Sequence, residues 1–312
     1  MRCLVTGAAG FIGSHLTRRL AVEGHEVRAV DCFRPTYDLA TKRENLAWAA
    51  GGGQVTSFET DLSRDGLEDL LHGVDVVFHL AGRPGVRDSW GDALAPYLQD
   101  NVLATERVLA AADGAAVAKV VLASSSSVYG EARRYPCRES DPPRPHSPYG
   151  VTKLAAEHLA GAHARNGGPA LVVLRFFSVY GPRQRPDMGL ARLFDAATTG
   201  ASFPLHGDGS QRRDLTAVDD VVEALRRAAE ADLRSGSVLN VAGGAPVALA
   251  ELLERVEQLT GRSIKVERHP PQRGDVTRTE GAIDCIRDQL GWEPTTTLAD
   301  GLTAMAAWHG DR

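Results

Sequence analysis

The sequence predicts an α/β fold in which a doubly wound parallel sheet carries a smaller C-terminal lobe. Short apolar runs alternate with helical patterns through roughly the first 180 residues of the chain. A glycine-rich turn joins the first apolar run to the first helical pattern. Beyond Tyr180 the elements become shorter and less regular. Strands that alternate with helices at this spacing form parallel sheets, because each helix returns the chain to the same edge.

The first strand, expected at residues 2–6, leads into the glycine-rich sequence TGAAGFIGSHL. Gly7 permits a tight turn, Gly10 lets the backbone approach a pyrophosphate, and Gly13 lets the following helix pack on the strand. The pyrophosphate is expected at the N-terminus of that helix, where unpaired N–H groups point outward. A strand, a glycine turn and a helix in this order predict a Rossmann-type dinucleotide site.

The second strand, at residues 26–30, ends in Asp31. An acid about twenty residues after the glycine loop accepts hydrogen bonds from the adenosine ribose and repels a 2′-phosphate. Asp31 therefore favours NAD over NADP. Arg34 lies close to it in the sequence and weakens this preference.

The third and fourth strands are expected at residues 55–60 and 75–80. Asp61 follows the third strand, and the fourth ends in Ala81-Gly82, where small residues let a cofactor pass close to the backbone. His79 lies within the fourth strand and is interpreted as a packed core residue. Ligands of such sheets bind beyond the carboxyl ends of the strands.

A long helix at about 88–112, containing Asn101, is expected before the fifth strand at 119–125. A proline-rich loop at 136–148 precedes a further helix, and the sixth strand follows at 170–177. In the remaining chain we expect short strands at 203–206, 215–218 and 237–241 and helices at 219–232, 249–260, 281–290 and 298–308. Residues 1–180 are thus predicted to form the dinucleotide-binding domain, with segments at about 210–245 returning to it, and residues 181–312 to supply most of the second lobe.

Composition narrows the classes of function. Net charge is −5 and the pI is about 6.1, so the basic surface of a nucleic-acid-binding protein is not indicated. No apolar run approaches the length that spans a bilayer. The four cysteines are scattered without paired spacing, so neither a metal site nor a disulfide framework is indicated. A cytoplasmic protein is expected.

Tyr149 and Lys153 lie four residues apart at the start of the helix expected at 149–165. This spacing puts both side chains on one face, about one turn apart. An ammonium group beside a phenol favours the phenolate and lowers its pKa from about 10. The pair therefore predicts that Tyr149 accepts a proton near neutral pH.

The glycine loop, Asp31, the strand-five serines and the Tyr149/Lys153 pair together resemble an extended short-chain dehydrogenase/reductase, over essentially the whole chain. Four stretches look more narrowly like NAD-dependent nucleotide-sugar epimerases. They are ASSSSVYG at 123–130, RFFSVYGPRQRPDM at 175–188, HGDGSQRRDLTAVDD at 206–220 and RGD at 273–275.

Within that group, AGRPGVRDS at 81–89, DCFRPTYDLATKR at 31–43 and the segment ending at Met188 are similar to UDP-glucuronate 4-epimerases. Arg83-Pro84 departs from the alanine-glutamine pair usual in that family. Sugar-nucleotide 4,6-dehydratases carry an Asp-Glu pair, and UDP-glucuronate decarboxylases a glutamate, where this chain has Ser126 and Ser127. Serines do not move the proton that those reactions require.

The resemblance implies roles for individual residues. Tyr149 takes the proton of the sugar 4-hydroxyl, Lys153 lowers the pKa of Tyr149 and holds the nicotinamide ribose, and Ser125 hydrogen-bonds the 4-oxygen. The residues expected to contact NAD are Gly7, Gly10, Phe11, Ile12, Gly13, Asp31, Asp61, Leu62, Leu80, Ala81, Asn101, Tyr149 and Lys153. The residues expected to contact the substrate are Arg87, Ser125, Ser126, Ser127, Ser178, Arg185, Met188, Arg213, Arg273 and Asp275.

Among the substrate residues, Arg185, Arg213, Arg273 and Arg87 are the expected partners of the UDP diphosphate, because bidentate arginine suits phosphate oxygens. Ser126, Ser127 and Ser178 suit a C6 carboxylate, which they bind without protonating it. The expected reaction is the 4-epimerisation of a UDP-sugar, with UDP-glucuronate favoured over UDP-glucose. Decarboxylation of UDP-glucuronate and a non-enzymatic NAD-sensing role are the alternatives. A homodimer through the helices at about 88–112 and 149–165 is expected.

Overall fold

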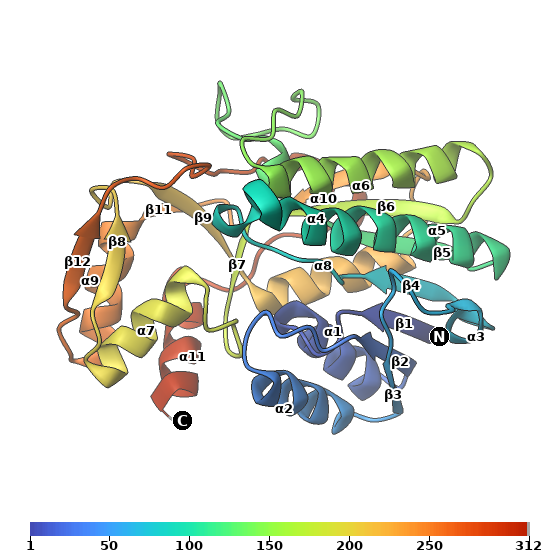
Figure 1. Cartoon of the computed structure of the whole chain (residues 1–312), viewed down its shortest axis with the longest axis horizontal. Coiled ribbons are helices and arrows are strands. Elements are labelled where there is room, and N and C mark those ends of the chain that lie inside the picture. The colour runs from blue at the N-terminus through green and yellow to red at the C-terminus, as the bar shows by residue number, and fades with distance from the viewer. Residues whose placement is uncertain (311–312) are drawn as a thin grey trace.

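The computed structural model describes residues 1–310, and a large parallel sheet forms its centre. Within these residues seven strands pair in the order β10-β6-β5-β4-β1-β2-β3, and every neighbouring pair is parallel. The predicted doubly wound α/β fold is therefore confirmed (Figure 1). The strands are β1 (Arg2–Thr6), β2 (Glu26–Asp31), β3 (Val55–Glu59), β4 (Val76–His79), β5 (Lys119–Ser125), β6 (Ala170–Phe176) and β10 (Ser237–Val241).

Helices cover both faces of this sheet (Figure 1). One apolar cluster lies between the sheet and the helices α1 (Phe11–Val22) and α8 (Val218–Glu230). A second lies on the other face, under α5 (Ala104–Gly114) and α6 (Pro148–Arg165). Because both faces are covered, the strands are apolar on both sides, which explains their continuous hydrophobic runs in the sequence. The other helices of this part of the chain are α2 (Leu39–Ala50), α3 (Glu68–Leu71), α4 (Leu94–Tyr97) and α10 (Asp284–Leu290).

The prediction of a single helix at about 88–112 was wrong for the first half of this range. Two 3-10 turns, Arg87–Ser89 and Gly91–Ala93, precede α4, and a π-helical segment, η3 (Leu98–Leu103), connects α4 to α5. Gly91 has a φ of 64°, in the left-handed region, so a regular helix cannot run through it. The π-helical segment contains Asn101, in keeping with the frequent occurrence of such turns at functional sites.

The smaller lobe contains two further sheets. A three-stranded sheet joins β7 (Ser178–Tyr180), β9 (Arg212–Ala217) and β11 (Pro246–Ala248), and β8 (Phe203–His206) pairs with β12 (Val266–His269). A separate apolar cluster fills this lobe. The strand expected at 203–206 and the helix expected at 249–260 are confirmed, whereas α2, α7 and β12 were not predicted. The helices of the lobe are α7 (Gly189–Thr199), α9 (Leu249–Thr260) and α11 (Leu298–Gly310).

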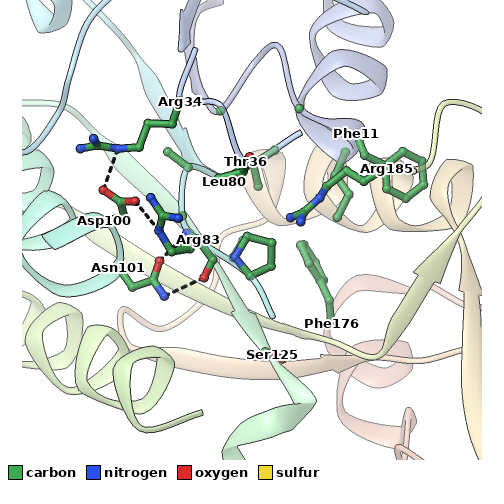
Figure 2. A pocket seen from close by; sticks show the side chains of 18 of the residues that line it. Phe11, Arg34, Thr36, Leu80, Arg83, Asp100, Asn101, Ser125, Phe176 and Arg185 are labelled. Atoms are coloured by element: carbon green, nitrogen blue, oxygen red, sulfur yellow. Dashed lines mark hydrogen bonds and ion pairs between the residues drawn. The ribbon is translucent and has the colours of Figure 1, made fainter. Parts of the chain in front are cut away.

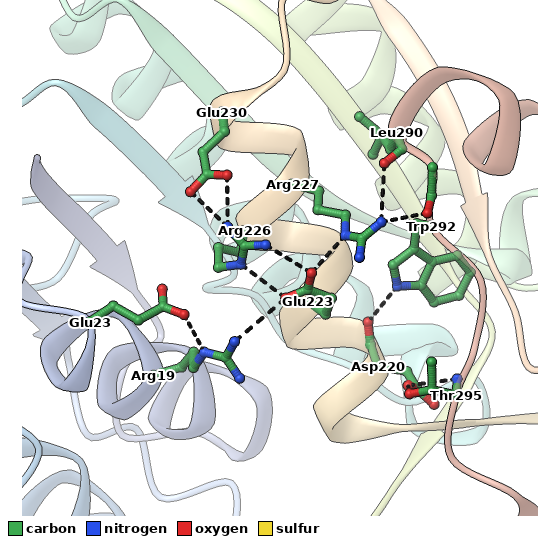
Figure 3. A network of polar contacts seen from close by, with 11 residues as sticks. Arg19, Glu23, Asp220, Glu223, Arg226, Arg227, Glu230, Leu290, Trp292 and Thr295 are labelled. Carbon is green, nitrogen blue, oxygen red and sulfur yellow. Dashed lines mark hydrogen bonds and ion pairs between the residues drawn. The ribbon is translucent and has the colours of Figure 1, made fainter.

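Helix α8 is fixed to its neighbours by charged and apolar contacts together (Figure 3). Glu223 accepts hydrogen bonds from Arg226 and Arg227 of its own helix and lies 3.8 Å from Arg19 of α1. Exposed ion pairs of this kind each contribute little to stability. The buried Trp292 adds the apolar part, and its indole N–H donates to the carbonyl of Asp220 at 2.9 Å. No helix within residues 1–310 is long and apolar enough to cross a membrane.

Candidate active site

A cavity of about 370 Å³ opens at the carboxyl ends of the central strands. Every residue that the sequence predicted to contact NAD lines this cavity. Six of the predicted substrate residues line it as well, namely Ser125, Ser126, Ser127, Ser178, Arg185 and Met188. Arg87, Arg213, Arg273 and Asp275 lie outside its wall. The structure therefore brings together the cofactor residues and the sugar residues, with one of the four expected diphosphate arginines, Arg185, among them.

The glycine loop fits a dinucleotide because it leaves no room for side chains. A Cβ atom on Gly13 would lie 2.1 Å from the carbonyl oxygen of Gly7, and one on Gly7, whose φ is 70°, would lie 3.0 Å from Ala81. Gly10 precedes α1 without a capping side chain, so the first N–H groups of the helix remain available. A pyrophosphate can take this position.

Asp31 lies at the end of β2, where an adenosine ribose is expected. Its carboxylate accepts the backbone N–H of Ala9 at 3.1 Å and that of Phe33 at 2.8 Å. Arg34 does not compete for this place, because its guanidinium contacts Asp61 at 3.0 Å and Asp100 at 2.9 Å. Two carboxylates thus neutralise Arg34, the cation that had weakened the preference for NAD.

Asn101 connects the segment after β4 to α6, the helix that carries Tyr149 and Lys153. Its side-chain oxygen accepts the N–H of Arg83 at 2.6 Å, and its amide nitrogen donates to the carbonyl of Arg83 and to Thr152 of α6. Figure 2 shows Arg83 continuing to Asp100, at 3.0 Å, and through it to Arg34. Sequence reasoning missed Arg34, Arg83 and Asp100 as lining residues. The departure at Arg83-Pro84 from the usual alanine-glutamine pair was the available signal.

The predicted catalytic pair, Tyr149 and Lys153, lies on the first turns of α6. Ser147 caps this helix by accepting the N–H of Gly150 at 3.1 Å, and Pro148 occupies the first turn, where its missing N–H costs nothing. Lys153 donates to the carbonyl of Ala123 in β5 at 2.6 Å. The lysine is thereby fixed to the sheet one turn beyond the phenol of Tyr149.

The electrostatics of the pair differ from the sequence expectation. Burial raises the pKa of Tyr149 above its ordinary value, opposed first by hydrogen bonding with Ser125 and then by the charge of Arg185. Lys153 was predicted to lower this pKa, and it is not among these causes. Burial also lowers the pKa of Lys153 itself, to about 8. Within the protein alone, Ser125 and Arg185 are the groups that favour the phenolate.

Glu157 and Arg175 form a buried ion pair next to Lys153, which was not predicted. Glu157 follows on the same face of α6, and its charge opposes the effect of burial on the pKa of Lys153. Arg175 of β6 holds Glu157 through two hydrogen bonds, at 2.7 and 3.0 Å. Ser124 also donates to Glu157. These side chains are almost fully buried, so the pair must remain matched.

Charge interactions link three of the four residues outside the cavity, namely Arg87, Arg213 and Asp275. The guanidinium of Arg87 contacts the carboxylate of Asp275 at 2.7 and 3.3 Å. Burial lowers the pKa of Arg213, while the charge of Asp275 raises this pKa and that of Arg87 lowers it. The fourth, Arg273, instead stacks on the indole ring of Trp90, with 3.7 Å between its guanidinium carbon and the ring centre.

Arg185 occupies a different position from the other arginines. It lines the cavity (Figure 2), forms an ion pair with Asp187, and its charge acts on Tyr149. It was expected to bind the diphosphate together with Arg87 and Arg213. The structure places it in the cavity with Tyr149, apart from Arg87 and Arg213. The sequence offered no signal for this difference, because Arg185 stands in the middle of a loop.

Residues 3–242 of the chain match the model of the NAD dependent epimerase/dehydratase family. The chain belongs to this family. A solved structure of MoeE5 in complex with UDP-glucuronic acid and NAD has 43% sequence identity, with a TM-score of 0.91 over 100% of this chain and 99% of that one. UDP-glucuronic acid 4-epimerase from Bacillus cereus, solved with UDP-glucuronic acid and NAD, has 35% identity, with a TM-score of 0.95 over the same shares.

A curated relative from Bacillus subtilis (strain 168), described as the uncharacterized UDP-glucose epimerase YtcB, is 37% identical over 99% of this chain and 98% of its own length. The resemblance to extended short-chain dehydrogenases/reductases is thus confirmed, and NAD is the cofactor. The chain is a NAD-dependent member of a family of UDP-sugar epimerases and dehydratases, and its relatives include UDP-glucuronate 4-epimerases.

Proposed function

We propose that this protein is a 4-epimerase that interconverts UDP-glucuronate and UDP-galacturonate through a 4-keto sugar. The observation that carries the proposal is the position of Arg185, whose positive charge lies near Tyr149 in the cavity that contains the predicted NAD residues. A cation at this place favours a sugar that carries a negative charge close to its reacting carbon. The C6 carboxylate of a uronate is such a charge.

The residues of the chain have distinct roles in this reaction. Bound NAD supplies a reversible hydride acceptor for C4. Tyr149 accepts the proton of the 4-hydroxyl and returns it after the keto sugar has turned over. In the protein alone the Ser125 hydroxyl favours the phenolate of Tyr149, and with substrate bound its one O–H donates instead to the 4-oxygen. Lys153, anchored to Ala123, orients the nicotinamide ribose.

A uronate substrate presents a second problem, which the serines of the cavity address. The 4-keto form of a uronate is a β-keto acid, and it loses CO₂ when the bond to the carboxylate aligns with the ketone π system. Hydroxyl donors hold the carboxylate turned away without giving it a proton. Ser126, Ser127 and Ser178 line the cavity together with Arg185 and are assigned to this task.

The nucleotide part of the substrate is assigned to the residues between the lobes. Arg213 and Arg87 are assigned to the diphosphate, since both lie outside the cavity wall and the charge of Arg87 acts on Arg213. Asp275 holds Arg87 in place and keeps its charge from repelling Arg213. Arg273, on the ring of Trp90, completes the predicted set. Met188, which lines the cavity, packs against the sugar.

Incubation of the protein with NAD and UDP-glucuronate, followed by chromatographic separation of the nucleotide sugars, tests the proposal. UDP-galacturonate is the expected product. A UDP-pentose as the main product would assign decarboxylation instead. UDP-glucose is the second substrate to test, because MoeE5 has also been solved with UDP-glucose and NAD. Faster turnover of UDP-glucose than of UDP-glucuronate would overturn the assignment of Arg185 to a carboxylate.

We also propose a homodimer, in the cytoplasm, formed through the exposed face of η3 and α6. Leu98, Leu103 and Val151 are between 46 and 53% exposed on this face, although they are large and apolar. Apolar side chains gathered on one face indicate an interface between proteins. Sedimentation velocity tests the proposal, and Leu103→Glu is expected to convert the dimer to a monomer. A wild-type protein that sediments as a monomer at all concentrations contradicts it.

A further inference from the structure

The loop that delivers Arg185 to the cavity is itself held by an unusual contact at Arg183. This loop, residues 181–188, connects β7 to α7. The guanidinium of Arg183 lies between two indole rings, 4.3 Å from the centre of Trp48 and 4.5 Å from that of Trp308. Trp48 belongs to α2 and Trp308 to α11, which come from opposite ends of the chain (Figure 1). A cation between two aromatic faces is attracted by both.

The backbone around Arg183 is as tightly determined as its side chain. Its φ is 62°, in the left-handed region, which an L-residue adopts only where the surroundings hold it. The side chain donates a hydrogen bond to Asn45 of α2 at 3.0 Å. His15 of α1 contacts the carbonyl of the preceding Pro182 at 3.0 Å.

The residue on the other side of Arg183 fixes the loop to its own lobe. Gln184 is buried, donates to the carbonyl of Val179 at 2.9 Å and accepts the N–H of Ala191 at 3.0 Å. The next residue is Arg185. The two residues before Arg185 thus anchor the loop, Arg183 to α2 and Gln184 to β7 and α7. Neither Arg183 nor Gln184 is part of the cavity wall.

We propose that Arg183, clamped between Trp48 and Trp308, is a positioning residue that sets Arg185 against the substrate carboxylate and so determines the preference for a uronate. The inference rests on the proposed function, because it requires Arg185 to bind the carboxylate. It adds that selectivity for the sugar depends on a contact outside the cavity. The clamp also makes the final helix, α11, a contributor to substrate choice.

A double-mutant cycle with two substrates tests this inference. The variants Arg183→Ala, Arg185→Gln and the double variant are compared with the wild type, each loaded with NAD. For UDP-glucuronate, each single variant is expected to raise KM by about tenfold, the worth of one charge-assisted hydrogen bond. For UDP-glucose, KM is expected to remain unchanged. The double variant should be no worse than Arg185→Gln alone, because the clamp acts only through that residue.

The chain offers a matched control in Arg18. Its guanidinium also stacks on Trp48, at 4.9 Å, but it belongs to α1 and is not part of the loop. Arg18→Ala is expected to leave the KM ratio of the two sugars unchanged. Arg183→Lys, which keeps a cation between the rings, is expected to restore part of the ratio. NAD affinity, measured by titration calorimetry, should be the same in all variants, and melting temperatures identify a variant that has only lost stability.

The possible outcomes separate the inference from the function on which it rests. A selective effect of Arg185→Gln without one of Arg183→Ala overturns the positioning role alone. Additive effects in the double variant, or an equal loss for both sugars in Arg183→Ala, overturn it as well. No selective effect of Arg185→Gln overturns both the carboxylate assignment and the inference. Selective and non-additive effects support both.

Discussion

The two halves of the candidate site are built by different means. The cofactor half lies at the ends of neighbouring parallel strands, and backbone atoms form much of it, as at Gly7, Gly13 and Ala81. The substrate half depends on side chains that meet across the chain, such as Arg87 and Asp275, which are 188 residues apart. A binding site formed by backbone atoms, such as the cofactor half, is specified by short sequence motifs. A set of side-chain pairs is specified only when the whole chain has folded.

The cofactor half and the substrate half also differ in where they carry positive charge. In the cofactor half the carboxylates of Asp61 and Asp100 neutralise Arg34, and the helix N-terminus is left to attract a phosphate. In the substrate half the arginines carry the positive charge themselves. Substitutions in the first half should therefore act through space and backbone, and substitutions in the second half through charge. Four experiments test this difference, beginning with the residue at the junction of the two halves.

Tyr149→Phe is expected to have the largest effect. Removal of the proton acceptor should reduce kcat by about a thousandfold, the usual contribution of general acid–base catalysis. Affinities for NAD and UDP-glucuronate should stay unchanged, since both halves remain intact. The control is Tyr97→Phe, because the Tyr97 ring meets Tyr149 edge-on at 6.2 Å but its hydroxyl donates only to backbone carbonyls. Retained turnover in Tyr149→Phe would exclude the phenol as the base.

Gly13→Ala is expected to break the cofactor half alone. The added methyl group would lie 2.1 Å from the carbonyl of Gly7, so the loop must move. We expect NAD affinity to fall by about a hundredfold, equivalent to roughly 2.7 kcal/mol. Calorimetric titration with NAD measures the loss, and UDP should still bind. Gly189→Ala is the matched control, because no atom lies within 4 Å of the place that its new methyl group would take. Equal losses in both variants would contradict the steric argument.

Asp214→Asn tests the scaffold of the substrate half through its pH dependence. Burial raises the pKa of Asp214 to about 6, although backbone N–H groups, among them those of Gly281 and Gly244, lower it. The folded protein therefore binds a proton that the unfolded chain releases above its ordinary pKa of 3.8. Stability contributed by this group is present below about pH 4 and is lost as pH rises to about 6.

The loss from Asp214 amounts to something on the order of 2 kcal/mol, and it should disappear in Asp214→Asn. Urea unfolding of both proteins between pH 4 and 7 measures the difference in slope. The comparison uses the difference between the two proteins, because other carboxylates act in the opposite direction. The pKa of Glu223, for example, is lowered to about 2, first through hydrogen bonding with Arg226. Parallel pH profiles for the two proteins would contradict the raised pKa.

Arg213→Gln is expected to have the smallest effect and to act on the substrate half only. Loss of one charged partner of the diphosphate should weaken UDP binding by about tenfold. The remaining affinity should depend less on salt than that of the wild type, while NAD affinity stays unchanged. Arg212→Gln is the control, since this neighbouring side chain donates to the carbonyl of Pro246 instead. A larger loss for NAD than for UDP would reverse the assignment of the two halves.

The sequence was sufficient for the parts of the molecule that local patterns determine. The strands of the large sheet, the glycine loop, Asp31 and the start of α6 follow from periodicity and from residues with special backbone preferences. It was not sufficient where tertiary contacts decide. The π-helical turn at Asn101, the pairing of Arg34 with two acids and the reversal of the expected pKa of Tyr149 all arise from segments that meet only in the folded protein.

The edge strand β10 has a consequence for how the chain reaches its folded form. It pairs with β6 although about sixty residues, which include β7, β8, β9 and α7 of the second lobe, separate the two. A nascent chain that has left the ribosome only as far as residue 180 exposes the unpaired N–H and C=O groups of β6, which favour aggregation. A gene divided at that point should therefore yield insoluble fragments, whereas extension of the first fragment beyond residue 241 supplies the missing partner.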